Sequence, residues 1–185
     1  MTVSVSKGFT MVELMITISI ASILLAVAVP SYQSLMQESR LTTQANELMT
    51  ALHYARSEAV KRGGRVTICK SSDGATCNGV NWEDGLLVFN DMDIAGSVDN
   101  GDEILRVFPK LNGSSLKGGG NFSSRVSYLR NGRSQGNNNF PNGTFTLCNQ
   151  GSARKIVINV SGRARVEKAG CPSNKEFPDE SENGD

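Results

Sequence analysis

Two arginines separated by one residue could bind phosphate in the last quarter of this chain. They lie in Gly162-Arg163-Ala164-Arg165, and guanidinium groups can grip phosphate oxygens bidentately. Nearby bases would extend the positive field: Arg133, Arg154, Lys155 and Lys168. No alternating aromatic side chains accompany them, so the expected contact is with a phosphate backbone and not with base edges. The alternative is a solvated hairpin end that serves only solubility.

The charges are segregated along the chain, although the formal net charge is only +1. From Asp73 to Glu103 there are eight acids and neither lysine nor arginine, whereas Arg106 to Lys168 holds eleven bases and one acid. The last ten residues, EFPDESENGD, add five acids. Such asymmetry indicates an anionic partner or an interaction tail; the alternative is a solvated surface whose halves attract each other.

The two arginines follow a segment with the alternation of a β-hairpin. If its apolar residues face the core, a two-residue loop would bury both arginines on the same face. A three-residue loop, 161–163, pairs Val160 with Ala164 instead, and the core face becomes apolar. We therefore expect Arg165 on the exposed face of the hairpin and Arg163 at its tip.

The N-terminal part of the chain is dominated by an apolar run at 9–29, FTMVELMITISIASILLAVAV, with one charge, Glu13. About 20 apolar residues span a bilayer as a helix. A carboxylate in such a run is costly unless it is paired, and the next basic residue is Arg40. The nearest cation would be the α-amine of Phe9, exposed by cleavage after Gly8, in the same chain or a neighbouring subunit. The alternative is a tolerated acid near the membrane interface.

Beyond Pro30, which should kink the helix or begin a new one, the helical period continues. Apolar residues recur at steps of three and four: Leu41, Ala45, Leu48, Leu52, Ala55 and Ala59. Gly63-Gly64 ends this amphipathic helix. Short alternating runs then predict antiparallel strands near 65–69, 85–89, 103–108, 125–129, 144–148, 155–160 and 164–168. The Gly/Asn/Ser-rich segments 114–120 and 131–139 are typical of mobile loops.

These patterns predict five parts: a leader (1–8), a membrane and assembly helix (9–29), its amphipathic continuation (30–63), a β-rich globular domain (64–172) and an acidic tail expected to be disordered (173–185).

The chain has four cysteines: Cys69, Cys77, Cys148 and Cys171. An even number behind an export segment predicts two disulfides in an oxidising compartment. Three connectivities are possible, and proximity in sequence favours Cys69–Cys77 and Cys148–Cys171. Zinc is the alternative, but no CxxC or histidine spacing supports it.

Other chemistry finds little support. Asp91-x-Asp93-x-x-Gly96 is similar to the start of a calcium loop, but Asp102 stands where a bidentate glutamate is usual, so a solvated loop without metal is expected. His53 has no nucleophile or acid partner near it in sequence. We therefore expect neither an enzyme nor a cofactor nor a small-molecule substrate.

The N-terminal sequence KGFTMVEL, followed by the apolar run and Pro30, resembles the class III signal of type IV pilins and pseudopilins. The resemblance implies that a prepilin peptidase cuts between Gly8 and Phe9, that the new terminal phenylalanine is methylated, and that Glu13 pairs with a neighbour's amine during assembly. It also implies a single pass through the inner membrane with the globular domain in the periplasm, followed by assembly with other pilin subunits into a fibre.

Four further motifs resemble the GspH/FimT family of minor pilins and pseudopilins: WEDGLLVF at 82–89, EILR at 103–106, TFTLC at 144–148 and GRAR at 162–165. The resemblance implies an α+β fold, in which a long N-terminal helix packs on an antiparallel β-sandwich-like domain. The GRAR element resembles that of FimT-type members linked to DNA uptake in natural transformation.

Together these features favour a minor pilin that binds double-stranded DNA without sequence preference. The alternatives are a structural minor pilin that primes pilus assembly, and a pseudopilin of type II secretion.

Overall fold

The computed structural model describes residues 8–78, 81–93 and 96–172. It divides the chain into two compact units, residues 1–39 and 40–185. Most of the expected leader and the acidic tail, 173–185, lie outside the described residues.

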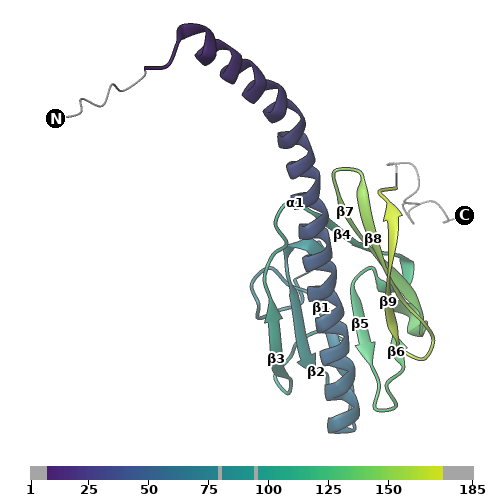
Figure 1. The fold of residues 1–185 in the computed structure, drawn as a ribbon. Coiled ribbons are helices and arrows are strands. Elements are labelled where there is room, and N and C mark those ends of the chain that lie inside the picture. The colour runs from purple at the N-terminus through teal and green to yellow at the C-terminus, as the bar shows by residue number, and fades with distance from the viewer. Residues whose placement is uncertain (1–7, 79–80, 94–95, 173–185) are drawn as a thin grey trace, which may run out of the picture. The chain divides into compact units, whose positions relative to one another are not determined.

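One helix, α1 (Met11–Arg62), forms the whole N-terminal part of the fold (Figure 1). It continues through Pro30, so a new helix does not begin there. Its start resembles a capping box, because the Glu13 N–H donates to Oγ1 of Thr10 at 3.3 Å and the acid stands at the third helical position. An 18-residue window of α1 has a mean hydropathy of 2.4 and is long and apolar enough to cross a membrane.

The second half of α1 presents one apolar face to the globular unit. All six residues of the predicted stripe are buried: Leu41, Ala45, Leu48, Leu52, Ala55 and Ala59. Gln44, which the periodicity places off the stripe, is also buried, and its Nε2 donates to the Asn112 carbonyl at 3.1 Å. The amphipathic helix is therefore confirmed, and its buried face is wider than the apolar pattern indicates.

Two antiparallel sheets complete the unit, in the strand orders β3-β2-β1-β5-β6 and β4-β7-β8-β9. The first sheet contains β1 (Val66–Lys70), β2 (Leu86–Asn90), β3 (Glu103–Phe108), β5 (Arg125–Tyr128) and β6 (Ser134–Gln135). The second contains β4 (Ser115–Gly118), β7 (Gly143–Asn149), β8 (Ser152–Ile158) and β9 (Ala164–Gly170). Three short 3₁₀ helices are described between them: η1 (Trp82–Asp84), η2 (Gly120–Phe122) and η3 (Asn137–Asn139). The α+β prediction is confirmed.

Two predicted loops contain strands. The segment 114–120 contributes β4, whose Leu116 is buried opposite Leu147, and 131–139 contributes the two-residue strand β6. Both segments are rich in glycine, asparagine and serine, which disfavour strands in isolation. Here each segment pairs along the edge of a sheet, so tertiary contacts outweigh the local preference.

A single core joins α1 to both sheets. Side chains of the helix stripe cluster with Ile68 and Val88 of the first sheet and with Phe145 and Ile156 of the second. Trp82 closes this core: its ring meets that of Phe145 edge-on at 5.0 Å, and its Nε1 donates to the Phe122 carbonyl at 2.9 Å. The second half of α1 and the two sheets therefore share one hydrophobic core.

The cysteines are arranged partly as expected. Cys69 and Cys77 form a disulfide, with Cα atoms 5.6 Å apart. Together with Leu87 and Phe89 they form a small second hydrophobic cluster. Contrary to the prediction, Cys148 and Cys171 are free thiols. Burial, together with a hydrogen bond to Cys171, raises the pKa of Cys148 to about 12.

Candidate nucleic-acid interface

The β8–β9 hairpin carries most of the predicted basic residues, in a register that differs from the prediction. Ile158 pairs with Ala164, and the Asn159 N–H donates to the Arg163 carbonyl at 3.1 Å, so the loop consists of residues 160–162. Val160, expected opposite Ala164 in the core, is half exposed in this loop. The predicted loop length is confirmed, but its position is wrong by one residue.

The shifted register still places both arginines on the surface. Arg165 pairs with Val157 and shares the outer face of the sheet with Lys155, and both side chains are exposed. The Arg165 Nε lies 2.7 Å from the Glu167 carboxylate, in an exposed ion pair of the kind that contributes at most about 1 kcal/mol. Arg165 can therefore exchange Glu167 for another anion at little cost.

Asn159 shapes the tip that presents Arg163. Its Oδ1 accepts hydrogen bonds from the Arg163 N–H at 2.9 Å and the Ser161 hydroxyl at 2.8 Å, and its carbonyl accepts from the Gly162 N–H at 2.8 Å. Gly162 has φ +77°, which favours glycine. The Arg163 side chain is exposed immediately after this turn.

Two predicted residues of this hairpin are not on the outer face. Arg154 is 6 % exposed, and its Nη1 donates to the Ala153 carbonyl at 3.2 Å. Lys168 pairs with Arg154, which by strand alternation puts it on the side of the sheet opposite to Arg165, although its side chain is exposed. Arg154 therefore contributes to the packed interior, contrary to the expectation of an exposed phosphate ligand.

Arg133 comes from the other sheet, in the turn between β5 and β6, and is exposed. This turn lies against the β8–β9 loop, because a Cβ on Gly162 would overlap the Gly132 carbonyl oxygen. Arg130, a further exposed base, belongs to the same turn. The structure thus brings Arg133 to Arg163, residues that are 30 positions apart in sequence.

Arg56 of α1 joins the two turns, and the sequence patterns do not single it out as a site residue. Its Nε donates to the Gly132 carbonyl at 2.9 Å and its Nη2 to the Ser161 carbonyl at 3.1 Å. Its acceptors are 76 and 105 residues away in sequence, so no local pattern indicates them.

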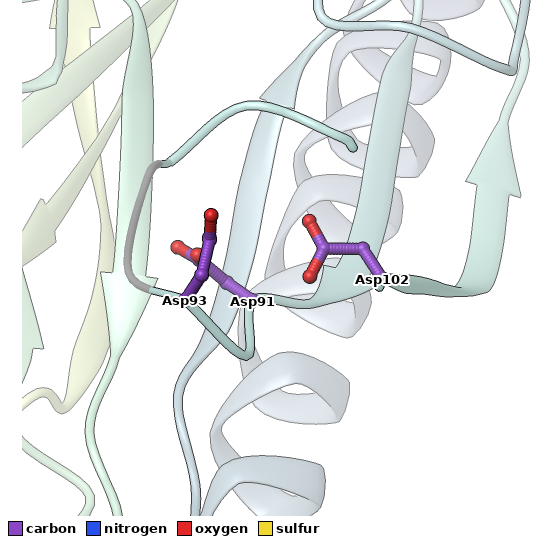
Figure 2. A group of neighbouring side chains, drawn as sticks. All are labelled: Asp91, Asp93 and Asp102. Carbon is purple, nitrogen blue, oxygen red and sulfur yellow. The ribbon is translucent and has the colours of Figure 1, made fainter. Parts of the chain in front are cut away.

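An acidic cluster lies in the loop between β2 and β3. Oxygens of Asp91, Asp93 and Asp102 lie within 4.8 Å of one another. Figure 2 shows the three side chains. Asp91 is 1 % exposed and accepts from the Thr67 hydroxyl at 2.7 Å and the Gly96 N–H at 3.3 Å. These bonds account for Asp91 as an anchor of its loop, and we assign no ion here.

The N-terminal site residues precede or begin α1. Gly8 and Phe9 are exposed ahead of the helix, and Glu13 is exposed in its first turn. His53 is exposed on the second half of α1.

Comparisons with known proteins agree on one class. Residues 44–162 match the family described as Type II transport protein GspH, and residues 4–29 match the prokaryotic N-terminal methylation motif. Pilin-like protein PilA1 of Thermus thermophilus is 30 % identical over 174 residues, which cover 87 % of this chain and 98 % of that protein. A fimbrial protein of Pseudomonas aeruginosa is 31 % identical over 120 residues, covering 60 % and 74 %.

Among solved structures, the fold is similar to that of the type IV minor pilin FimU of Pseudomonas aeruginosa. One crystal form gives a TM-score of 0.56 at 24 % identity, covering 72 % of this chain and 92 % of that one. A second crystal form gives 0.53 at 26 % identity, covering 69 % and 92 %.

Proposed function

The chain belongs to the GspH family of pilin-like proteins and carries their N-terminal methylation motif, and we propose that it is a FimT-type minor pilin that binds DNA for uptake in natural transformation. Proteins of this family are structural subunits of type IV pili or type II secretion systems and not enzymes. The DNA-binding element in this proposal is the exposed end of the β8–β9 hairpin, with Arg163 and Arg165 as its phosphate ligands.

The observation that carries the proposal is the exposure of Arg163 and Arg165 at the end of a rigid hairpin. Gly162 and Asn159 fix the turn, so little backbone freedom would be lost on binding. Lys155 on the same outer face adds to the positive field. Phosphate contacts of this kind position a duplex without reading its sequence, so we propose non-specific binding.

The N-terminal part supports assembly into a fibre. We propose that a prepilin peptidase removes residues 1–8 from an inner-membrane precursor and that the apolar half of α1 then packs with other subunits. In this proposal Glu13 pairs with the α-amine of a neighbouring Phe9, because a carboxylate surrounded by apolar helices requires a counter-charge.

The experiment is a DNA titration of the full chain in an uncharged detergent. Fluorescence polarisation with two unrelated duplexes, at several salt concentrations, should give equal affinities that are micromolar or weaker at physiological salt. With about three to five phosphate contacts, log K should fall with log salt at a slope of roughly −3 to −5.

The variant Arg163→Gln with Arg165→Gln should weaken binding to both duplexes alike and flatten this slope by up to about two units. The matched control, Arg40→Gln with Lys117→Gln, removes the same charge from exposed positions elsewhere. Equal weakening in the two double variants would show that the hairpin end is not the site. Absence of binding by the unaltered chain at low salt would favour a structural minor pilin or a secretion pseudopilin.

A further inference from the structure

Two hairpin turns in this molecule have the same form. In the first tip (129–133), the Leu129 N–H donates to the Arg133 carbonyl at 2.9 Å, and the Gly132 N–H donates to the Leu129 carbonyl at 2.7 Å. In the second tip (159–163), Asn159, Gly162 and Arg163 make the equivalent bonds at 3.1 and 2.8 Å. The glycines have φ +74° and +77°, as expected for a three-residue loop with a G1 bulge.

Each tip places an exposed arginine directly after its glycine: Arg133 in the first tip and Arg163 in the second. The first tip carries a further exposed arginine, Arg130, and the strand after the second carries Arg165. The two turns belong to different sheets, so their similarity does not follow from pairing with each other.

The tips touch each other through their glycines. A Cβ on Gly162 would overlap the Gly132 carbonyl oxygen, so the Cα of Gly162 lies within about 4 Å of that oxygen. Standard backbone dimensions then put the Cα atoms of Arg133 and Arg163 within about 12 Å of each other. The Ser134 hydroxyl, which also bonds to the Pro141 carbonyl, lies 3.3 Å from the Asn159 carbonyl across the same contact.

Arg56 of α1 bonds to both tips at this contact. Its guanidinium donates to one carbonyl of each tip, Gly132 at 2.9 Å and Ser161 at 3.1 Å. Hydrogen bonds from a charged donor are about twice as strong as neutral ones, and the rigid fork fixes both acceptors at once. Arg56 itself is half-buried, whereas the arginines of the tips are exposed.

Resting on the DNA binding proposed above, we propose that the two tips form one paired-tip site, in which Arg130 and Arg133 contact the same nucleic-acid backbone as Arg163 and Arg165. Arg56 is the positioning residue of this site. Three exposed arginines on the two adjoining turns, together with Arg165 at the start of β9, offer four guanidinium groups to a run of phosphates, which is the chemistry of a nucleic-acid strand.

The test uses the full chain in an uncharged detergent and the same duplex titration. Arg130→Gln with Arg133→Gln should weaken binding at 0.1 M salt by about tenfold for each phosphate that is no longer bound, and should flatten the salt slope as much as Arg163→Gln with Arg165→Gln does. The control is again Arg40→Gln with Lys117→Gln. Arg40 lies 16 residues before Arg56 on α1, roughly 24 Å along the helix axis, and Lys117 is on β4 at the opposite edge of the sheet from β9.

Arg56→Lys tests the positioning role, because it keeps the charge but removes the fork. It should lower the affinity of the otherwise unaltered chain about fivefold or more. In the background of Arg130→Gln with Arg133→Gln it should have no further effect, because the alignment of the two tips matters only when both bind. If Arg56 only stabilised the fold, Arg56→Lys would weaken binding equally in both backgrounds. That result would overturn the assignment of Arg56 as a positioning residue.

The outcomes separate this inference from the proposed function. If Arg163→Gln with Arg165→Gln weakens binding but Arg130→Gln with Arg133→Gln matches the control, the paired-tip site is wrong and the single hairpin stands. If the unaltered chain does not bind the duplex at low salt, or if both tip variants match the control, both proposals are overturned.

Discussion

At the scale of single residues, what an arginine does in this molecule depends on the atoms that surround its guanidinium. Arg154 is buried and bonds to a backbone carbonyl, whereas Arg106 lies over the rings of Tyr54 and Phe108 at 5.6 and 4.9 Å. Arg56 bridges two turns. Only part of the basic charge counted along the sequence is therefore available to an anionic ligand, and four exposed arginines of that part lie at or beside the two tips.

The N-terminal residues lead to a prediction about processing. The protein should be cut between Gly8 and Phe9, and Gly8→Arg should leave the leader attached because its bulky side chain obstructs the peptidase. Intact-mass analysis of membrane-extracted protein checks this. Glu13→Ala is the matched control: its mature chain should begin at Phe9, but it should enter fibres poorly because it cannot form the charge pair with a neighbouring subunit. A mature chain that begins beyond Val29 would contradict the pilin-type leader.

At the scale of elements, turn glycines decide the hairpin geometry more than strand patterning does. The apolar alternation predicts that Val160 lies in the core, two residues beyond the end of β8. The structure instead ends the strand at Ile158, because Asn159 and Gly162 form a complete turn that leaves Val160 in the loop. Periodicity determines which face a residue takes, and turn chemistry determines where the strand ends.

Gly162 gives the prediction that belongs to this scale. Gly162→Ala should lower the free energy of unfolding of the globular unit by about 3 kcal/mol. About 1–2 kcal/mol of this comes from the positive φ, and the rest from overlap with the Gly132 carbonyl. Urea unfolding followed by the fluorescence of Trp82, the one tryptophan and a buried residue, measures this decrease.

Gly151→Ala is the control for Gly162→Ala. Gly151 has φ +90°, but a Cβ there would meet no atom within 4 Å, so it isolates the backbone strain. Its cost should be about 1–2 kcal/mol, and its DNA affinity should be unchanged. Equal destabilisation by the two substitutions would mean that overlap with the Gly132 carbonyl, at the contact between the two tips, adds nothing to the cost of Gly162→Ala.

The elements differ in how far the sequence could predict them. The helix stripe and most strands follow from local apolar periodicity, which survives into the structure as burial. The strands β4 and β6 could not be predicted, since each is short, polar and paired at an edge. The two hydrogen bonds from the Arg56 guanidinium could not be predicted either, because both acceptors are backbone carbonyls that only the complete fold brings near Arg56. Arg163 and Arg165 could be found because a three-residue loop, whether at 160–162 or at 161–163, leaves both side chains off the buried face of the hairpin.

At the scale of the whole molecule, the charges that are segregated along the sequence lie on different loops. Asp91, Asp93 and Asp102 gather at the acidic cluster in Figure 2. Asp99 also belongs there: the Gly101 N–H lowers its pKa, but a hydrogen bond with Asp93, burial and the neighbouring carboxylates outweigh this and raise it overall. The basic tips lie on other turns, but the first tip and this cluster share one end of the first sheet, since Val66 pairs with both Asn90 and Tyr128.

The acidic segment 173–185 is a further source of negative charge, with five acids and one lysine. It follows Cys171, whose N–H donates to the Gly151 carbonyl at 3.1 Å, at the end of the β8–β9 hairpin opposite its tip. Thirteen residues can span up to roughly 43 Å, whereas the seven residues of β9 span about 23 Å. The chain length therefore allows the later acids of this segment to reach the tips and compete with DNA phosphates.

Removing the segment after Pro172 should strengthen DNA binding several-fold at 0.05 M salt, since its net charge of about −4 would no longer compete for the arginines. The gain should shrink as salt rises, because the Debye length falls from roughly 14 Å to about 7 Å between 0.05 and 0.2 M. Polarisation titrations of the full and truncated chains at both concentrations measure this.

A full-length variant in which Glu176, Asp179, Glu180, Glu182 and Asp185 become amides should match the truncated chain, and a shuffled segment with the same charges should match the original. An affinity that is unchanged or lower after truncation would mean that the acids do not compete at the tips. A gain on truncation that the amide variant does not reproduce would assign the effect to chain length and not to charge.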